Sequence, residues 1–466
     1  MTDARRFLFP AFFLAVAIVA IAPIRNYDFF WHLATGRWIV EHGALPLRDP
    51  FTVASDRSEW VNGEWLFEIV VYGVERVVGV VGLSVVGGLL AALVFVGLIG
   101  PIGPMRPIGL ALSAIAFAGA MPTFDVRPAS VALVFLVLAL RARSPVAHAI
   151  IAALWMNVHP SALLAPGVAA LSTRRVAPTI ASALALLLNP YGLRGILAPV
   201  ELTLFARSGQ FVNTEWLPSS IARFPLLYIC IGIAAIAFGT AENRREHWWR
   251  ALLLGGFAWL AMEHVRNQGL FFAAFAVLVA PMVRADRIQP RIVYAAAVLV
   301  LVFVGLTADH RLGAPPERFP IAAVARLKAS GLPGHIYNPD QFGGFLIWSF
   351  YPHRRALTDG RNELYHAFIP EYAHARTDER AWRALVAKYR IDLAVDEYRP
   401  PLQVMNAVTR EVMSMPASLA YWPRQKWALI AFDEAGMVFA RRAAFPPEVL
   451  EKWEIRGVVP DARMTR

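Results

Sequence analysis

The acids best placed for chemistry lie between residues 25 and 76, among tryptophan and histidine side chains. Asp28 follows directly on the first long apolar run, which places it at the surface of a membrane if that run crosses one. A carboxylate partly removed from water is a stronger base, so Asp28 is a candidate to accept a proton where a lipid-borne and an aqueous substrate meet. The alternative is an acid that caps a helix or meets water at the interface.

Two further acids and two tryptophans in this segment are also candidates. Glu64 and Asp49 could contact hydroxyl groups of an acceptor, or a metal ion. Because Asp49 precedes Pro50, a turn residue is its simpler interpretation. Trp31 and Trp65 could stack on a sugar ring, although tryptophan also gathers at membrane interfaces for purely physical reasons.

Cationic candidates lie where apolar runs end. Arg127 and Arg266 each stand at the mouth of such a run, and His159 lies between two short ones. Ionisable groups at membrane depth are functional candidates by default. The alternatives are arginines that snorkel to water or pair with Asp125 and Glu263, and a histidine that is satisfied in the interior. No second histidine stands nearby at metal-ligand spacing, which argues against zinc; the use of another divalent metal is left open, and no other cofactor is indicated.

The composition predicts that helices in a bilayer position these residues. Of the 466 residues, 57% are hydrophobic and 17% are charged, and the mean hydropathy is +0.48. These values exclude an ordinary soluble enzyme, a disordered chain and, with Cys230 as the only cysteine, a disulfide scaffold. We expect a polytopic α-helical membrane protein of about 11 spans, near 7–24, 77–100, 107–121, 128–140, 146–157, 160–171, 177–189, 224–240, 249–262, 268–283 and 292–307.

The distribution of arginine predicts the orientation of these spans. Arginine-rich loops, among them those at Arg106 and at Arg284 and Arg287, fall on the side of the N-terminus, which the positive-inside rule places in the cytoplasm. An odd number of spans puts the C-terminus outside. The first run lacks a small-residue cleavage site and is expected to be a retained span. The polar step at 157–160 favours a broken or re-entrant pair of helices, which membranes tolerate only where the backbone lines a cavity or is buried in protein.

The sequence divides into a membrane domain, residues 1–308 with a large first outer loop at 25–76, and a charged C-terminal α/β domain, residues 309–466. In the latter, periodicity predicts helices at 321–330, 341–350 and 379–389, strands at 335–338, 355–357 and 391–395, and a hairpin at 427–441. This alternation favours a Rossmann-like layer, without a phosphate-binding glycine fingerprint. Polar turns at 338–344 and 358–363 follow strands, where ligands bind in such layers, although turn chemistry also explains them.

The first 80 residues resemble a known family of membrane enzymes. Asp28, a short helix near 32–40, Gly43 with Pro46, and the polar-aromatic stretch 59–66 follow the outline of its first loop. The family is that of the polyprenyl-phosphate-dependent integral-membrane glycosyltransferases of the GT-C fold, which include protein O-mannosyltransferase-like and aminoarabinose-transferase-like enzymes. Its commonest pattern has two adjacent acids, whereas here Phe29 follows Asp28.

The resemblance implies an inverting sugar transfer from a polyprenyl-phosphate-linked donor to a glycan, lipid or protein acceptor. Asp28 would act as the base, and Arg127, Arg266 and His159 would stabilise the leaving phosphate. It also implies a bacterial inner-membrane protein that works on the periplasmic face.

Two other classes of function compete with this one. A transporter or flippase of lipid-linked sugar would need paired ionisable residues within spans and inverted repeats. A non-catalytic scaffold would use its periplasmic domain to bind a partner. The net charge of +11 is not gathered on one face, so a nucleic-acid partner is not expected.

Overall fold

The computed structural model describes residues 3–98, 107–207, 209, 214–283, 289–405 and 412–465. They form two compact units, one made of Met1–Asn26 and Val61–Gly313, the other of Tyr27–Trp60 and Ala314–Arg466. The chain therefore passes between the units three times, and the segment 27–60 is grouped with the C-terminal region. The periplasmic location of the C-terminal domain stays a prediction. Arg106, Arg284 and Arg287 lie outside the described residues.

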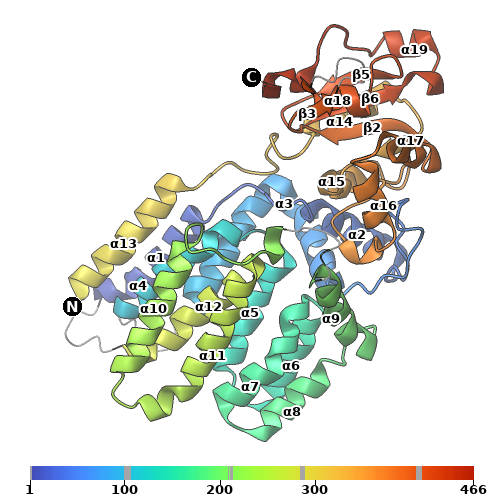
Figure 1. The fold of residues 1–466 in the computed structure, drawn as a ribbon. Helices are drawn as coiled ribbons and strands as arrows, with labels where there is room; N and C mark the ends of the chain where they lie inside the picture. Colours follow the sequence, from blue (N-terminus) through green and yellow to red (C-terminus); the bar gives the residue numbers. More distant parts are fainter. Residues whose placement is uncertain are drawn as a thin grey trace. The chain divides into compact units, whose positions relative to one another are not determined.

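The first unit is a helical bundle (Figure 1). Its apolar runs form helices because in lipid the backbone must satisfy its own hydrogen bonds. The α-helices are α1 (Asp3–Val19), α3 (Trp65–Ala92, continued by a π-helix Leu93–Gly97), α4 (Pro107–Ala120), α5 (Pro128–Arg141), α6 (Pro145–Met156), α7 (Ala165–Thr173), α8 (Val176–Ala185), α9 (Leu193–Arg207), α10 (Pro225–Thr240), α11 (Arg244–Glu263), α12 (Gln268–Val279) and α13 (Pro290–Thr307). Short 3₁₀ helices lie at Met121–Thr123, Pro160–Leu164, Thr214–Trp216, Val265–Asn267 and Ala280–Met282.

Several of these helices are suited to a bilayer. Within the described residues, three helical stretches are long and apolar enough to cross a membrane, namely Trp65–Gly97, Val265–Met282 and Pro290–Thr307, and seven shorter apolar helices accompany them. The polytopic helical character is thus confirmed. The number of 11 spans stays a prediction.

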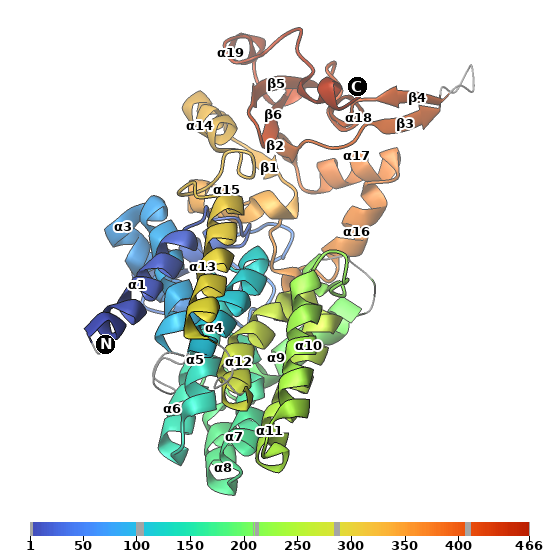
Figure 2. The same ribbon diagram turned by 90° about the vertical axis from the view of Figure 1, so that its left-hand side faces the viewer.

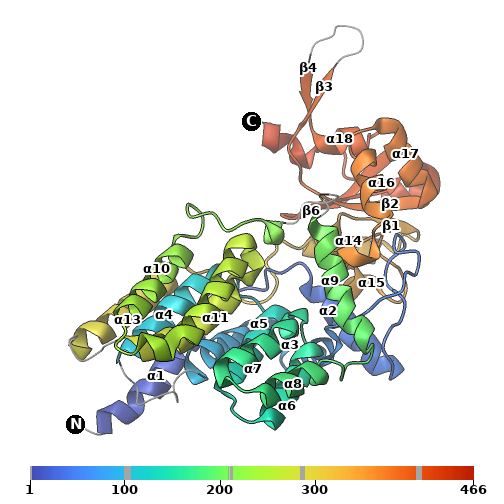
Figure 3. The same ribbon diagram turned by 60° about the horizontal axis from the view of Figure 1, so that its bottom comes forward.

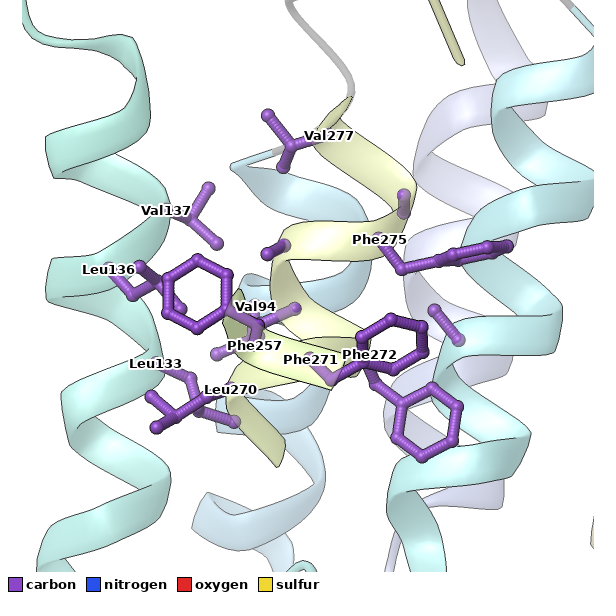
Figure 4. Packing of buried hydrophobic residues seen from close by; sticks show 14 of the residues in the cluster. Val94, Leu133, Leu136, Val137, Phe257, Leu270, Phe271, Phe272, Phe275 and Val277 are labelled. Atoms are coloured by element: carbon purple, nitrogen blue, oxygen red, sulfur yellow. The ribbon is translucent and has the colours of Figure 1, made fainter. Parts of the chain in front are cut away.

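The core of the bundle is built around α12. This helix packs against α4, α5, α10 and α11, and α10 and α11 form a long neighbouring pair (Figure 2). Phe271, Phe272 and Phe275 are buried, and in the close view they spread around α12 among side chains of neighbouring helices such as Leu136 (Figure 4). Fixing α12 in this way also fixes the residues at its ends.

The predicted break between two short spans is confirmed. Helix α6 ends at Met156, and the chain resumes helical structure at Pro160. The side chain of Asn157 stabilises the break, because its Nδ2 donates to the carbonyl oxygens of Ala153 at 2.7 Å and of Leu188 at 2.8 Å. His159 is thereby held outside both helices.

The second unit combines helices with a small sheet (Figure 3). Its helices are α2 (Phe29–His42), α14 (Ile321–Ser330), α15 (Asp340–Phe350), α16 (Phe368–Ala375), α17 (Glu379–Lys388), α18 (Ala417–Tyr421) and α19 (Pro447–Glu451), with 3₁₀ helices at Asn362–Leu364, Arg442–Ala444 and Pro460–Thr465. Its strands are β1 (His335–Tyr337), β2 (Ile391–Glu397), β3 (Leu402–Met405), β4 (Val412–Met415), β5 (Trp427–Phe432) and β6 (Gly436–Arg441).

The sheet corrects the Rossmann-like prediction. Its order is β1-β2-β6-β5, in which β1 and β2 are parallel and the pairs β2–β6 and β6–β5 are antiparallel. A mixed sheet results because a tight hairpin at residues 433–435 returns the chain antiparallel. The strand predicted at 355–357 is also wrong: Ala356 makes a single parallel bridge to Thr52.

Helix α2 is an integral part of the second unit. Phe30 contacts Phe319 and Phe345, with ring centroids 5.0 Å apart in each pair, and α2 packs along α15. Gly344 permits this approach, since a Cβ there would lie 2.9 Å from the carbonyl oxygen of Tyr27. Phe29, Leu33 and Ile39 of α2 are therefore buried within this unit, whereas Val40 near the end of the helix is exposed.

Candidate active site

Three predicted cationic residues meet at one end of the bundle. Arg127 immediately precedes α5, His159 follows α6, and Arg266 follows α11. Because these helices run alternately up and down, the start of α5 and the ends of α6 and α11 lie at the same end. The acids Glu64 and Glu215 join them there. We call these five residues the Arg127 cluster.

Hydrogen bonds set the orientation of the side chains in the Arg127 cluster. Arg127 Nη1 lies 2.5 Å from Glu215 Oε1. The Nδ1 atom of His159 accepts a hydrogen bond from the backbone N–H of Ser161 at 3.1 Å, which leaves the proton of a neutral ring on Nε2. That Nε2 faces Glu64 Oε1 at 3.9 Å.

The charges of the Arg127 cluster act on one another. Arg127 and Arg266 both lie within electrostatic range of His159 and of Glu215. The guanidinium of Arg266 also lies over the ring of Trp216, 4.8 Å from its centroid. The result is a confined group of two guanidiniums, two carboxylates and an imidazole.

In the chain as the structure describes it, Arg127 does not form the ion pair with Asp125 that the sequence offered as an alternative; it pairs with Glu215. Asp125 accepts hydrogen bonds from the backbone N–H groups of Arg25 and Asn26, at 2.8 and 2.7 Å. Asp125 therefore anchors the end of the first segment, while Arg127 pairs with Glu215, about 90 residues further along the chain. The sequence analysis did not single out Glu215, because nothing in its local pattern distinguishes it from other loop acids.

Trp65 lies close to the break after α6. Its Nε1 donates to Asn157 Oδ1 at 2.8 Å, and the backbone N–H of Leu66 donates to the Asn157 carbonyl at 3.1 Å. The indole ring is only partly buried. Trp65 thus stands at the first turn of α3, directly after Glu64.

Asp28 belongs to the second unit, at the start of α2. The indole N–H of Trp31 donates to Asp28 Oδ1 at 3.1 Å. The turn containing Gly360 approaches the same oxygen, since a Cβ on Gly360 would lie only 2.1 Å from it. The Asp28 carboxylate is therefore held between an indole donor and a side-chain-free stretch of backbone.

Arg361 organises the surroundings of that turn. It is buried, and its Nη2 pairs with Asp49 Oδ1 at 3.0 Å and also with Asp359. Its guanidinium lies over the ring of Trp60, 4.4 Å from the centroid, and more distantly over Trp31. Two segments far apart in the sequence are thus joined by one cation.

Asp49 is buried and both of its carboxylate oxygens accept hydrogen bonds from protein groups. Burial opposes its ionisation, but Arg361 and hydrogen bonds from Thr52 and from the backbone of Phe51 hold its pKa below the usual range. These are the contacts of a turn residue, the simpler of the two interpretations. Asp49 is 1% exposed.

The ring of Trp31 is also enclosed by protein. It is 7% exposed, and it lies 3.7 Å from the ring of His32, centroid to centroid. Its indole N–H is used by Asp28. These contacts favour a role in orienting Asp28.

Glu363 is a further acid beside Asp28. It follows Arg361 on the 3₁₀ helix Asn362–Leu364. Burial, together with the charges of Asp359 and Asp28, raises its pKa to about 7. The sequence analysis placed it only within a polar turn, because burial by a segment some 300 residues away leaves no local signal. In the part of the chain that the structure describes, no group of three or more His, Cys, Asp or Glu is arranged to hold a metal ion.

Solved structures of similar fold include two of an archaeal oligosaccharyltransferase. One is the oligosaccharyltransferase of Archaeoglobus fulgidus in the apo form, with a TM-score of 0.54 and 10% identity over 85% of this chain and 70% of that one. The chain has the fold of an archaeal oligosaccharyltransferase. The other is the oligosaccharyltransferase AglB from the same organism in complex with an inhibitory peptide and a dolichol-phosphate, with a TM-score of 0.57 and 10% identity over 89% of this chain and 75% of that one.

This fold agrees with the predicted resemblance to polyprenyl-phosphate-dependent glycosyltransferases of the GT-C fold. The agreement concerns the fold, since the identity to both oligosaccharyltransferase structures is low. No family model matches the sequence, and no curated protein matches it.

Proposed function

We propose that this protein is a membrane glycosyltransferase that moves a sugar from a polyprenyl-phosphate-linked donor to an acceptor hydroxyl. The observation that carries the proposal is the Arg127 cluster, in which two guanidiniums and a histidine lie together at one end of an apolar bundle. A fold shared with a protein whose structure contains dolichol-phosphate supports it.

The Arg127 cluster is suited to an anionic leaving group. A guanidinium presents a fork of donors that matches phosphate oxygens, and its attraction to charge is strong where water is scarce. Arg127 and Arg266 both act on His159 and on Glu215, so their positive charges are gathered at the place where an anionic leaving group would be stabilised. The Nε2–H of His159 is another donor that a phosphate oxygen can accept.

Asp28 is the base of the proposed reaction. The acceptor oxygen attacks the anomeric carbon as its proton passes to the Asp28 carboxylate. The bond from that carbon to the phosphate oxygen breaks, and the lipid phosphate leaves with the electron pair and is stabilised by Arg127 and Arg266. The hydrogen bond from Trp31 and the close approach of Gly360 support this role, because they fix the direction of the carboxylate.

The setting that we propose is the periplasmic face of a bacterial inner membrane, with the C-terminal region outside. Glu64 and Trp65, which stand together at the start of α3, are proposed to contact the acceptor and the sugar ring. The turns at 338–344 and 358–363 are proposed to meet the acceptor.

The decisive experiment separates binding from chemistry. Sugar transfer and donor binding are measured in membranes with a labelled polyprenyl-phosphate sugar. We expect Asp28→Asn to abolish transfer while donor binding persists, and Arg127→Gln with Arg266→Gln to weaken donor binding. Arg223→Gln is the matched control, since this arginine is exposed and its guanidinium lies over the ring of Phe224.

Two results would count against the proposal. Full transfer by Asp28→Asn would remove the assigned base. Movement of the intact lipid-linked sugar across vesicle membranes, without cleavage from its phosphate, would instead indicate a flippase.

A further inference from the structure

The end of the bundle opposite the Arg127 cluster carries a second group of arginines. Arg143 lies between α5 and α6, Arg174 follows α7, and Arg250 lies in the second turn of α11. Helices α5, α7 and α11 each have the Arg127 cluster near one end and one of these arginines near the other. We call these three residues the Arg250 cluster. The ends of α6, α7 and α11 that carry them are the lower ends of these helices in Figure 1.

The three arginines are close together. Arg143 and Arg174 both lie near enough for their charges to act on Arg250. Helix α11 packs against α7, which accounts for the approach of Arg174 to Arg250. Arg143 reaches toward α7, where its Nη1 donates to the Ser172 carbonyl at 3.4 Å.

Neutral groups hold these guanidiniums in place. Arg143 also donates to the carbonyl of Ala142, and Arg250 Nη1 lies 2.8 Å from His247 Nδ1 and over the ring of Trp249. Among the described residues, no carboxylate forms an ion pair with Arg143, Arg174 or Arg250. The nearest acid acting on this group is Glu246, whose charge reaches His247.

The cluster also holds buried polar atoms that have no partner. His148 and Ser172 are 1% and 6% exposed, and His148 Nε2 and Ser172 Oγ make no hydrogen bond within the described residues. Both residues lie near Arg143. The charge of Arg143 acts on His148, and Arg143 Nη1 donates a hydrogen bond to the Ser172 carbonyl. The neutral ring of His148 donates to the Ala142 carbonyl and so presents Nε2 as an acceptor, whereas the Ser172 hydroxyl and the grouped guanidiniums supply donors for an anion.

An exposed apolar stripe leads away from the arginines. On α6 the side chains of Val146, Ile150 and Leu154 are exposed at helical spacing, and they begin one turn after Arg143. Trp248, beside Arg250, is 47% exposed, and tryptophan anchors helices at the level of lipid head groups. A ligand with a phosphate head and an acyl chain fits this combination, whereas free phosphate would use only the arginines.

We propose that the Arg250 cluster binds the phosphate of an anionic membrane lipid, with an acyl chain along α6. Basic sites between membrane helices recognise such head groups because guanidiniums near an acidic leaflet gain electrostatic energy from each contact. The site lies apart from the proposed chemistry, so it holds whether or not sugar transfer is found.

The test uses the purified full-length protein in a neutral detergent. Its thermal unfolding midpoint is followed with added phosphatidylglycerol, phosphatidylcholine or inorganic phosphate. We expect phosphatidylglycerol to raise the midpoint in a concentration-dependent way, and the other two to leave it nearly unchanged. The shift should be lost in Arg143→Gln with Arg250→Gln and retained in Arg175→Gln, an exposed arginine beside Arg174.

The single variant Arg174→Gln serves if the double variant fails to fold, because Arg174 is exposed. Loss of the phosphatidylglycerol shift in this variant would support the site. Equal shifts with phosphatidylcholine or inorganic phosphate, or a shift unchanged in the cluster variants, would overturn it.

Discussion

Arg361 shows how one buried cation can hold distant parts of a chain together. It pairs with Asp49 in the segment 27–60 and with Asp359 in the C-terminal region. Removing one partner of a buried pair leaves an uncompensated charge, at a cost of about 3–5 kcal/mol. Asp49 and Asp359 therefore matter for the stability of the second unit.

We expect Asp49→Asn to lower the thermal unfolding midpoint strongly, measured by the loss of intrinsic fluorescence or by differential scanning fluorimetry. The control is Arg383→Gln, which breaks an exposed pair with Glu379 and should cost less than about 0.5 kcal/mol. Similar midpoints for the two variants would contradict the role assigned to Arg361.

Gly360 is expected to be intolerant of any side chain if Asp28 is the base. In Gly360→Ala the new Cβ would lie 2.1 Å from Asp28 Oδ1 and would displace the carboxylate. Sugar transfer should fall at least about 100-fold, because displacing a catalytic group by about 1 Å has that effect. Donor binding should persist in Gly360→Ala, and a loss of donor binding would show that Gly360 acts elsewhere.

Glu363 predicts a pH dependence of stability. Its pKa rises from 4.5 to about 7 on folding, so the folded state keeps a proton that the unfolded state releases. The contribution is complete below about pH 4.5 and is lost as the pH rises toward 7. Glu363→Gln should flatten the fall in unfolding midpoint over that range. An unchanged pH profile would assign the dependence to other groups.

At the scale of elements, local sequence patterns predicted the positions of many helices and strands. They did not predict which distant residues pair with one another. Helices α14 and α17, strand β2 and the β5–β6 hairpin lie close to their predicted positions, because periodicity and a terminal glycine are local signals. The parallel bridge of Ala356 to Thr52 and the pair of Arg127 with Glu215 join residues far apart in sequence. No single stretch contains both partners, so neither could be found from local spacing.

Close packing of α4 against α12 gives a prediction for the bundle. A Cβ on Gly119 would lie 2.3 Å from the ring of Phe272, so Gly119→Ala should overpack the core and destabilise it by about 1–3 kcal/mol. Gly109, on the same helix, has no heavy atom within 4 Å of such a Cβ. Gly109→Ala should therefore leave the thermal unfolding midpoint unchanged or raise it; a lower midpoint in both variants would refute the packing argument.

At the scale of the whole molecule, the remaining prediction is topology. The arginine distribution puts the C-terminal region on the periplasmic side. A reporter enzyme active only in the periplasm, fused after Arg442, should be active in bacterial cells. The paired cytoplasmic reporter at the same position should be silent, and the reverse pattern would invert the orientation.

The grouping of residues 27–60 with the C-terminal region has a consequence for biosynthesis. A ribosome delivers this segment early, yet its packing partners α15 and Arg361 emerge only after every helix of the bundle has been translated. The turn that contacts Asp28 is consequently made only when the last third of the polypeptide is synthesised. If Asp28 is the base, as proposed, the growing chain stays inactive until Arg361 has been added, and termination before Arg361 leaves Asp28 without the turn that orients it.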